Sequence, residues 1–252
     1  MSPSIEGLDT RRRDLVPRPR PHSTSSPDAA ASQARRLLGS DLGPIAQLRA
    51  GRLGRRLAQL FVGLLLYGVS LALMVRGNVG LAPWDVLHSG LIERVPVTLG
   101  QAVVLMSFVV LLLWIPLQEQ PGIGTIANAV VVGLSADATL WVLEEPGALA
   151  ARVALMVGGI VLCGAASGLY IGAQLGRGPR DGLMTGLARR TGRSIRLVRT
   201  LLEVAVVLVG LALGGVLGAG TVAYALTIGP LTQLFLPWCL VDLEQPETIV
   251  TS

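Results

Sequence analysis

Lysine is absent from this sequence of 252 residues, and charge of either sign is scarce. All 21 basic residues are arginines, and only 15% of the residues are charged. Soluble globular domains usually carry about 25% charged residues, which is well above the fraction in this chain. The mean hydropathy of the chain is +0.61, an apolar balance. This shortage of charge excludes an ordinary soluble domain and indicates a membrane protein.

Cysteine and histidine are also rare, with two residues of each. Cys163 and Cys239 lie in apolar runs without CxxC spacing, so we expect no metal site, no redox pair and no cofactor. The sequence lacks a phosphate-binding loop, an HExxH motif and a nucleophile elbow in the appropriate context, and we therefore expect no enzyme. No basic surface with interspersed aromatic residues supports a nucleic-acid partner.

The arginines are concentrated at the N-terminal end of the chain. Eleven of them precede residue 57, in a segment rich in Ser and Pro that has no early apolar core and so differs from a signal peptide. We predict that residues 1–56 form a disordered cytoplasmic tail and residues 241–252 a short cytoplasmic tail. Arg49, Arg52, Arg55 and Arg56 are expected to form a basic edge at the membrane surface.

Six segments are long and apolar enough to be transmembrane helices, which need about 20 such residues. They are approximately residues 57–75, 99–117, 123–143, 153–174, 197–217 and 219–240. The predicted fold is an all-α, polytopic membrane helix bundle. Near the ends of these spans lie Trp84, Trp114, Trp141 and Trp238, where the membrane interface favours indole rings. The last two spans are rich in glycine, including Gly210, which allows close helix packing.

The arginines beside the spans predict their direction. The loop after the fourth span holds seven arginines, whereas the opposite side has Arg76, Arg94 and Arg152. By the positive-inside rule, this loop and both termini are predicted to be cytoplasmic.

Two halves of the chain match each other at a separation of 96 residues. The matching blocks are PxDxLxxGLxxR, with Pro83 paired to Pro179 and Asp85 to Asp181, and GxGTxAxA. This ordered match indicates a duplication, with repeats at residues 57–143 and 149–240. Because each repeat contains three spans, the second copy enters the membrane from the opposite side, which predicts inverted-topology repeats.

Each repeat has a PxD element after its first span and a polar, glycine-rich stretch. Proline suits the first turn of a helix, and an aspartate two residues later complements the positive helix end. Short helices are therefore predicted to begin at Pro83 and Pro179. Either Asp85 and Asp181 only stabilise these helix starts, or the short helices are partly re-entrant and direct the carboxylates into a central cavity.

Three further ionisable residues fall within or near the predicted spans. Arg199 and Glu203 are four residues apart on one helix face, which favours a local salt bridge, and Asp137 is close enough to the external interface for partial solvation. Ionisable residues in spans are functional candidates because their burial in lipid is costly. The candidates for a substrate or ion pathway are Asn78, Pro83, Asp85, Asp137, Gln174, Pro179, Arg180, Asp181 and Glu203.

Three strings in this order resemble the bacterial YczE-like integral membrane proteins, a group that includes YyaS and YitT proteins. The strings are GNVGLAPWDVLHSGL, GRGPRDGLMTGLARRTGRSIRLVRT and GAGTVAYALTIGPLTQ. The resemblance covers about residues 58–238 and implies a multi-pass protein of the bacterial plasma (inner) membrane. It implies no substrate and no mechanism.

Two functions agree with these features. The first is a small secondary transporter or permease with a site between inverted repeats, and the alternative is a non-transporting membrane scaffold or accessory, regulatory protein. A transporter requires a cavity that reaches the membrane midplane with Asp85 or Asp181 on its wall, whereas a scaffold would be solidly packed. The expected partners are the lipid bilayer, a small-molecule or ion substrate and a second copy of the chain in a homodimer.

Overall fold

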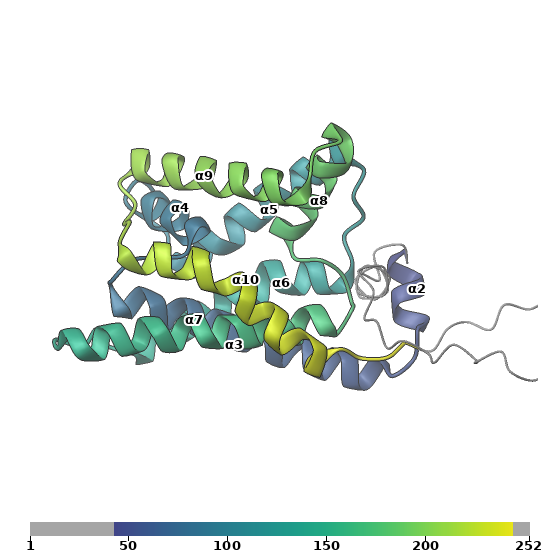
Figure 1. Cartoon of the computed structure of the whole chain (residues 1–252), viewed down its shortest axis with the longest axis horizontal. Helices are drawn as coiled ribbons and strands as arrows, with labels where there is room; N and C mark the ends of the chain where they lie inside the picture. Colours follow the sequence, from purple (N-terminus) through teal and green to yellow (C-terminus); the bar gives the residue numbers. More distant parts are fainter. Residues whose placement is uncertain (1–42, 244–252) are drawn as a thin grey trace, which may run out of the picture. The chain divides into compact units, whose positions relative to one another are not determined.

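The structure, a computed structural model, describes residues 43–243, and every regular element in this range is a helix (Figure 1). The predicted tails up to residue 42 and from residue 244 lie outside the described residues. The helices are α2 (Pro44–Arg49), α3 (Leu53–Gly77), α4 (Pro83–Ile92), α5 (Leu99–Leu117), α6 (Ile123–Val142), α7 (Leu149–Gly172), α8 (Pro179–Thr191), α9 (Ile195–Leu213) and α10 (Ala219–Cys239).

Within residues 43–243, five helices are long and apolar enough to cross a membrane, namely α3, α5, α6, α7 and α10. Large apolar side chains on their surfaces, such as Leu112, Leu134 and Leu226, are exposed, as lipid-facing positions should be. The chain is a polytopic helical membrane protein. Helix α9, at the position predicted for another span, contains Arg196, Arg199 and Glu203 within 19 residues and is not among these five.

The two PxD elements form short helices that begin at the predicted prolines, α4 at Pro83 and α8 at Pro179. Each short helix follows a non-helical segment, residues 78–82 before α4 and residues 173–178 before α8. These two segments are called the breaks. Asn78 (φ 47°) and Gln174 (φ 55°) adopt left-handed backbone conformations in these breaks. The chain therefore changes direction twice, at positions 96 residues apart.

The segment near the membrane differs from the predicted irregular tail. Residues 44–49 form α2, and α3 begins at Leu53, before the predicted start at residue 57. Arg56, expected at the membrane surface, is 0% exposed. Its guanidinium donates hydrogen bonds to the carbonyls of Gln47 (2.5 Å), Ala173 (2.9 Å) and Gln174 (2.8 Å). A cation is stabilised there because Ala173 and Gln174 lie at the carbonyl end of α7.

An equivalent arrangement lies 96 residues further along the chain. Arg152, near the start of α7, donates from Nε to the carbonyl of Gly77 (3.1 Å) and from Nη2 to that of Asn78 (2.7 Å). The start of each long helix thus bonds to the end of the other, so α3 and α7 are antiparallel. They also make the most extensive contact between any two helices of the described chain.

The breaks are bonded to the other half of the chain a second time. The amide of Gly124, in the first turn of α6, donates to the carbonyl of Leu175 (2.8 Å). The amide of Gly220, in the first turn of α10, donates to the carbonyl of Val79 (3.0 Å). The donors of these two bonds are 96 residues apart in the sequence, and so are the acceptors.

Glycines allow the short helices to approach α5 and α9 closely. A Cβ added to Gly210 of α9 would lie 2.6 Å from the backbone of Val86 in α4, in agreement with the close packing predicted at this glycine. A Cβ added to Gly182 of α8 would lie 2.0 Å from the ring of Trp114 in α5. Trp114, predicted near a span end, is buried in this contact.

Arg56→Gln is expected to lower the free energy of unfolding by about 2–3 kcal/mol, because buried carbonyls lose a charged donor. Thermal unfolding of the purified protein in detergent micelles measures this loss. Arg55→Gln, at an exposed neighbouring position, is the control. Equal melting temperatures for the two variants would contradict the role of Arg56 in joining the halves.

Candidate functional site

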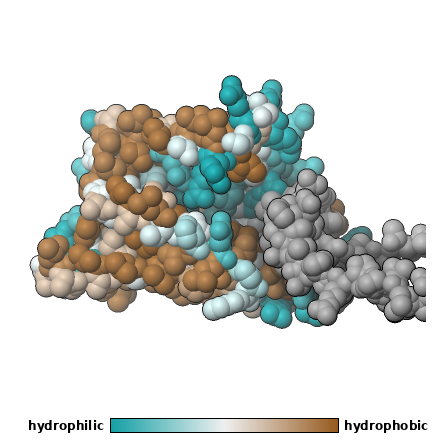
Figure 2. All heavy atoms as spheres, viewed as in Figure 1, coloured by the Kyte–Doolittle hydropathy of each residue, from teal (hydrophilic) through white to brown (hydrophobic). Residues whose placement is uncertain are grey.

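A cavity of about 230 Å³ lies where α8 meets α3, α4, α6, α7, α9 and α10. Its wall includes all three tyrosines of the chain, Tyr67, Tyr170 and Tyr224. Figure 2 shows hydrophilic residues gathered between α9 and α10, with apolar surface on either side. The remaining polar side chains of the wall are Asn128, Ser167, Arg180, Asp181, Arg199, Glu203, Thr232 and Gln233.

Five of the predicted pathway residues lie at this cavity, and a sixth lies at a smaller space beside it. Pro83, Pro179, Arg180, Asp181 and Glu203 line the large cavity. Asp85 lines the smaller one. The structure thus brings both PxD elements to one region of the bundle.

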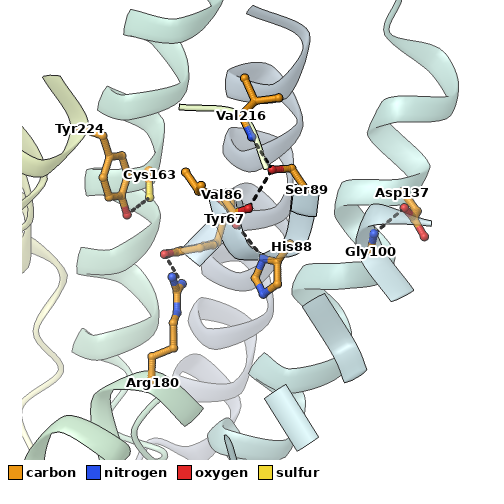
Figure 3. Close-up of polar contacts among 11 residues, drawn as sticks. Tyr67, Val86, His88, Ser89, Gly100, Asp137, Cys163, Arg180, Val216 and Tyr224 are labelled. Atoms are coloured by element: carbon orange, nitrogen blue, oxygen red, sulfur yellow. Dashed lines mark hydrogen bonds and ion pairs between the residues drawn. The ribbon is translucent and has the colours of Figure 1, made fainter. Parts of the chain in front are cut away.

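Arg180 is the second residue of α8 and contacts residues from the first half of the chain. Its Nη2 donates a hydrogen bond of 2.6 Å to the hydroxyl oxygen of Tyr67 (Figure 3). Its Cζ lies 5.6 Å from the ring centroid of Tyr67 and 5.7 Å from that of Trp84, within the range of cation–π attraction. Arg180 forms no ion pair within the described part of the chain.

Asp181, the next residue, is also held by a tyrosine. The hydroxyl of Tyr170 donates a hydrogen bond of 2.5 Å to Asp181 Oδ2. The ring of Tyr170 packs edge-on against that of Tyr67, with centroids 6.1 Å apart. Like its neighbour Arg180, Asp181 has no oppositely charged partner among residues 43–243.

Trp84, predicted near a span end, is 5% exposed and lies on the walls of both cavities. Its Nε1 is buried and has no acceptor among the described residues. A buried donor without an acceptor is costly and requires an explanation. Trp141, by contrast, is 90% exposed, as expected of an interfacial indole.

Asp85 has a different partner from its counterpart Asp181. Its Oδ1 lies 3.0 Å from Nδ1 of His88, and both residues are buried. The cavity they line has a volume of about 20 Å³, enough for about one water molecule. The residue equivalent to His88 in the second half is Met184, so this pair exists in one half only.

Arg199 and Glu203 form the predicted local salt bridge on α9. Arg199 Nε lies 2.9 Å from Glu203 Oε1. Both residues line the large cavity. Their charges therefore compensate each other at its wall.

Asn78 and Gln174 lie outside the residues that line the two cavities. Asn78 Nδ2 donates to Glu145 Oε1 (2.9 Å), and Gln174 Nε2 donates to the carbonyl of Val241 (2.8 Å). Their backbone carbonyls bind Arg152 and Arg56, as described above. These two candidates join the halves of the bundle.

Asp137 also lies apart from both cavities. It accepts hydrogen bonds from the hydroxyl of Thr98 and from the amide of Gly100 (2.8 Å), at the start of α5. Figure 3 shows Gly100 and Asp137 separated from Tyr67 and Arg180. Asp137 thus ties α6 to the first turn of α5.

The tyrosines and Trp84 are among the residues of the cavity wall that were not predicted as site residues from the sequence. A weak signal existed for Trp84, because it lies inside a PxD element and 96 residues before Arg180. No such signal existed for Tyr67 and Tyr170, because their counterparts 96 residues away are Cys163 and Met74.

The sequence profile of a family of unknown function (DUF6198) matches residues 54–237. An uncharacterised protein of Haemophilus influenzae is 40% identical over 70% of this chain and 81% of its own length. The uncharacterised membrane protein YczE of Bacillus subtilis is 29% identical over 70% of this chain and 83% of its own. The uncharacterised protein YyaS of the same organism is 24% identical over 70% and 90%. No solved structure matches the chain.

Asp137→Asn is expected to lower the free energy of unfolding by about 1 kcal/mol, because an amide can accept only one of the two hydrogen bonds at the start of α5. Asp181→Asn keeps an oxygen acceptor for Tyr170 and is expected to change stability less. Thermal unfolding in detergent compares the two variants. A larger loss for Asp181→Asn would contradict these assignments.

Proposed function

The chain belongs to the DUF6198 family of unknown function, and from its cavity we propose that it is a small-solute secondary transporter of the bacterial plasma membrane. The observation that carries this proposal is a polar cavity of about 230 Å³ inside a bundle of apolar helices, with Asp181 and Arg180 on its wall. Charged side chains are costly at such a position and are generally retained for function. Ile228 and Gly229, at the middle of α10, also line the cavity, which supports a position near the membrane midplane.

The proposed mechanism uses two inverted-topology repeats, with α9 as the sixth span and both termini in the cytoplasm. Support comes from the contacts that recur at a separation of 96 residues, in which Arg56 and Arg152 exchange places between the halves. Support also comes from the residues that meet at the cavity, since Pro83 and Pro179 occupy equivalent positions and both line it. Movement of one repeat against the other would then open this cavity to alternate sides.

The competing function, a membrane scaffold, calls for solid packing between the halves. The cavity and the unpaired charges of Arg180 and Asp181 favour transport over this alternative.

Alternating access predicts that a cysteine at the cavity reacts with a membrane-impermeant thiol reagent from both sides of the membrane. We expect this for Ser167→Cys, a small change at the cavity wall, in a variant in which Cys163 and Cys239 are replaced. The measurement is labelling in intact cells and in inverted membrane vesicles.

Two exposed loop positions are the controls. Cysteine at Pro96 should react only from outside, and cysteine at Arg193 only from inside, because these loops are equivalent in inverted repeats. Labelling of both loops from one side would refute the inverted topology. Labelling of position 167 from one side only, or from neither, would reject alternating access and favour the scaffold.

A further inference from the structure

We infer that the cavity binds a zwitterion, a small molecule that carries one anionic and one cationic group. This inference deepens the proposed transport function and rests on it. It follows from the charges at the cavity wall and from the donors that lack a partner there.

Four charged side chains line the large cavity, and only two of them form an ion pair with each other. Arg199 and Glu203 form an ion pair. Arg180 and Asp181 are instead held by the neutral hydroxyls of Tyr67 and Tyr170. A ligand that matches this wall must therefore offer a negative group to Arg180 and a positive group to Asp181.

The cavity wall offers free hydrogen-bond donors to the anionic group of the ligand. Arg180 uses Nη2 for Tyr67, and its Nε and Nη1 have no hydrogen-bond acceptor in the described chain. Trp84, whose ring lies against the Arg180 guanidinium, has a buried Nε1 that also lacks an acceptor. A carboxylate or phosphate could accept from the guanidinium with two oxygens, the geometry that arginine favours.

The cavity wall offers a carboxylate and aromatic ring faces to the cationic group of the ligand. Asp181 Oδ2 accepts from Tyr170, whereas Oδ1 has no donor among the described residues. An ammonium group bound there would also lie beside tyrosine rings, whose faces attract cations. The cavity of about 230 Å³ is smaller than a typical site for a drug-sized ligand, which limits the ligand to the size of an amino acid or a lipid head group.

Free α-amino acids and the phosphoethanolamine head of a membrane lipid share this chemistry. The free solute would enter from water. The lipid head would enter from the bilayer between α9 and α10, where Figure 2 shows the polar residues on an otherwise apolar face.

The test is the shift in melting temperature of the full chain, purified in a neutral detergent, with each of two ligand sets. One set contains the twenty standard L-amino acids, and the other contains dihexanoyl phosphatidylethanolamine. For an amino acid that stabilises the protein, the matched amine without its carboxylate and the matched acid without its amine are compared. For the lipid, the comparison is dihexanoyl phosphatidylglycerol, which keeps the phosphate and lacks the ammonium. We expect the zwitterion to bind at least tenfold more tightly than its singly charged analogues.

Variants of the cavity wall test which residues bind the anionic group and which bind the cationic group of the ligand. Arg180→Gln and Trp84→Phe should each remove the preference of the protein for the zwitterion over the amine. Asp181→Asn should remove the preference for the zwitterion over the acid. Arg193→Gln and Glu144→Gln, at exposed positions, should leave binding unchanged. Trp84→Phe removes the N–H donor and keeps a smaller aromatic ring, so it tests the anionic group if Arg180→Gln does not fold.

Equal affinity of the zwitterion and a singly charged analogue would overturn the inference, as would the absence of binding in both ligand sets. Labelling of position 167 from both sides together with no zwitterion binding would reject this ligand class and leave the transport proposal standing. Zwitterion binding together with labelling from one side would support the ligand class and reject transport. The ligand set that binds identifies the source as water or bilayer.

Discussion

Free backbone carbonyls at two breaks in the chain, between α3 and α4 and between α7 and α8, are the constraint on which the rest of the structure depends. The last carbonyls of a helix have no donor within that helix, and a carbonyl left without any donor when it is buried costs about 1–3 kcal/mol. Arg152 binds the carbonyls of the first break, and Arg56 those of the second. Each arginine comes from the other half of the chain, so each break is bonded to the half that does not contain it.

This mutual bonding decides where the short helices lie. With both breaks held, α4 and α8 start in one region, and Trp84 and Arg180, which are equivalent in the two halves, lie face to face. The cavity forms beside this contact and is lined by equivalent residues from both halves, such as Asn128 and Tyr224. Positions 96 residues apart thus contribute to one cavity with different side chains.

The structure places some of the polar residues near the breaks at the cavity and others away from it. Arg180 and Asp181 lie at the cavity, as the PxD hypothesis requires. The side chains of Asn78 and Gln174, selected for the same reason, instead donate to the carboxylate of Glu145 and to the carbonyl of Val241. Both roles use polar side chains in glycine-rich stretches, and sequence alone does not distinguish a side chain that bonds the protein from one that faces a cavity.

The sequence by itself determined most of the helices and the repeated pattern at a separation of 96 residues, because helix length, proline at a first turn and a repeated pattern are read directly from the chain. It located the starts of α4 and α8 at Pro83 and Pro179 and the bounds of α5 at residues 99 and 117. Only the tertiary structure decided which charges are paired. The hydroxyl that binds Arg180 is 113 residues distant in the chain, and the cost of a buried charge depends on such distant partners.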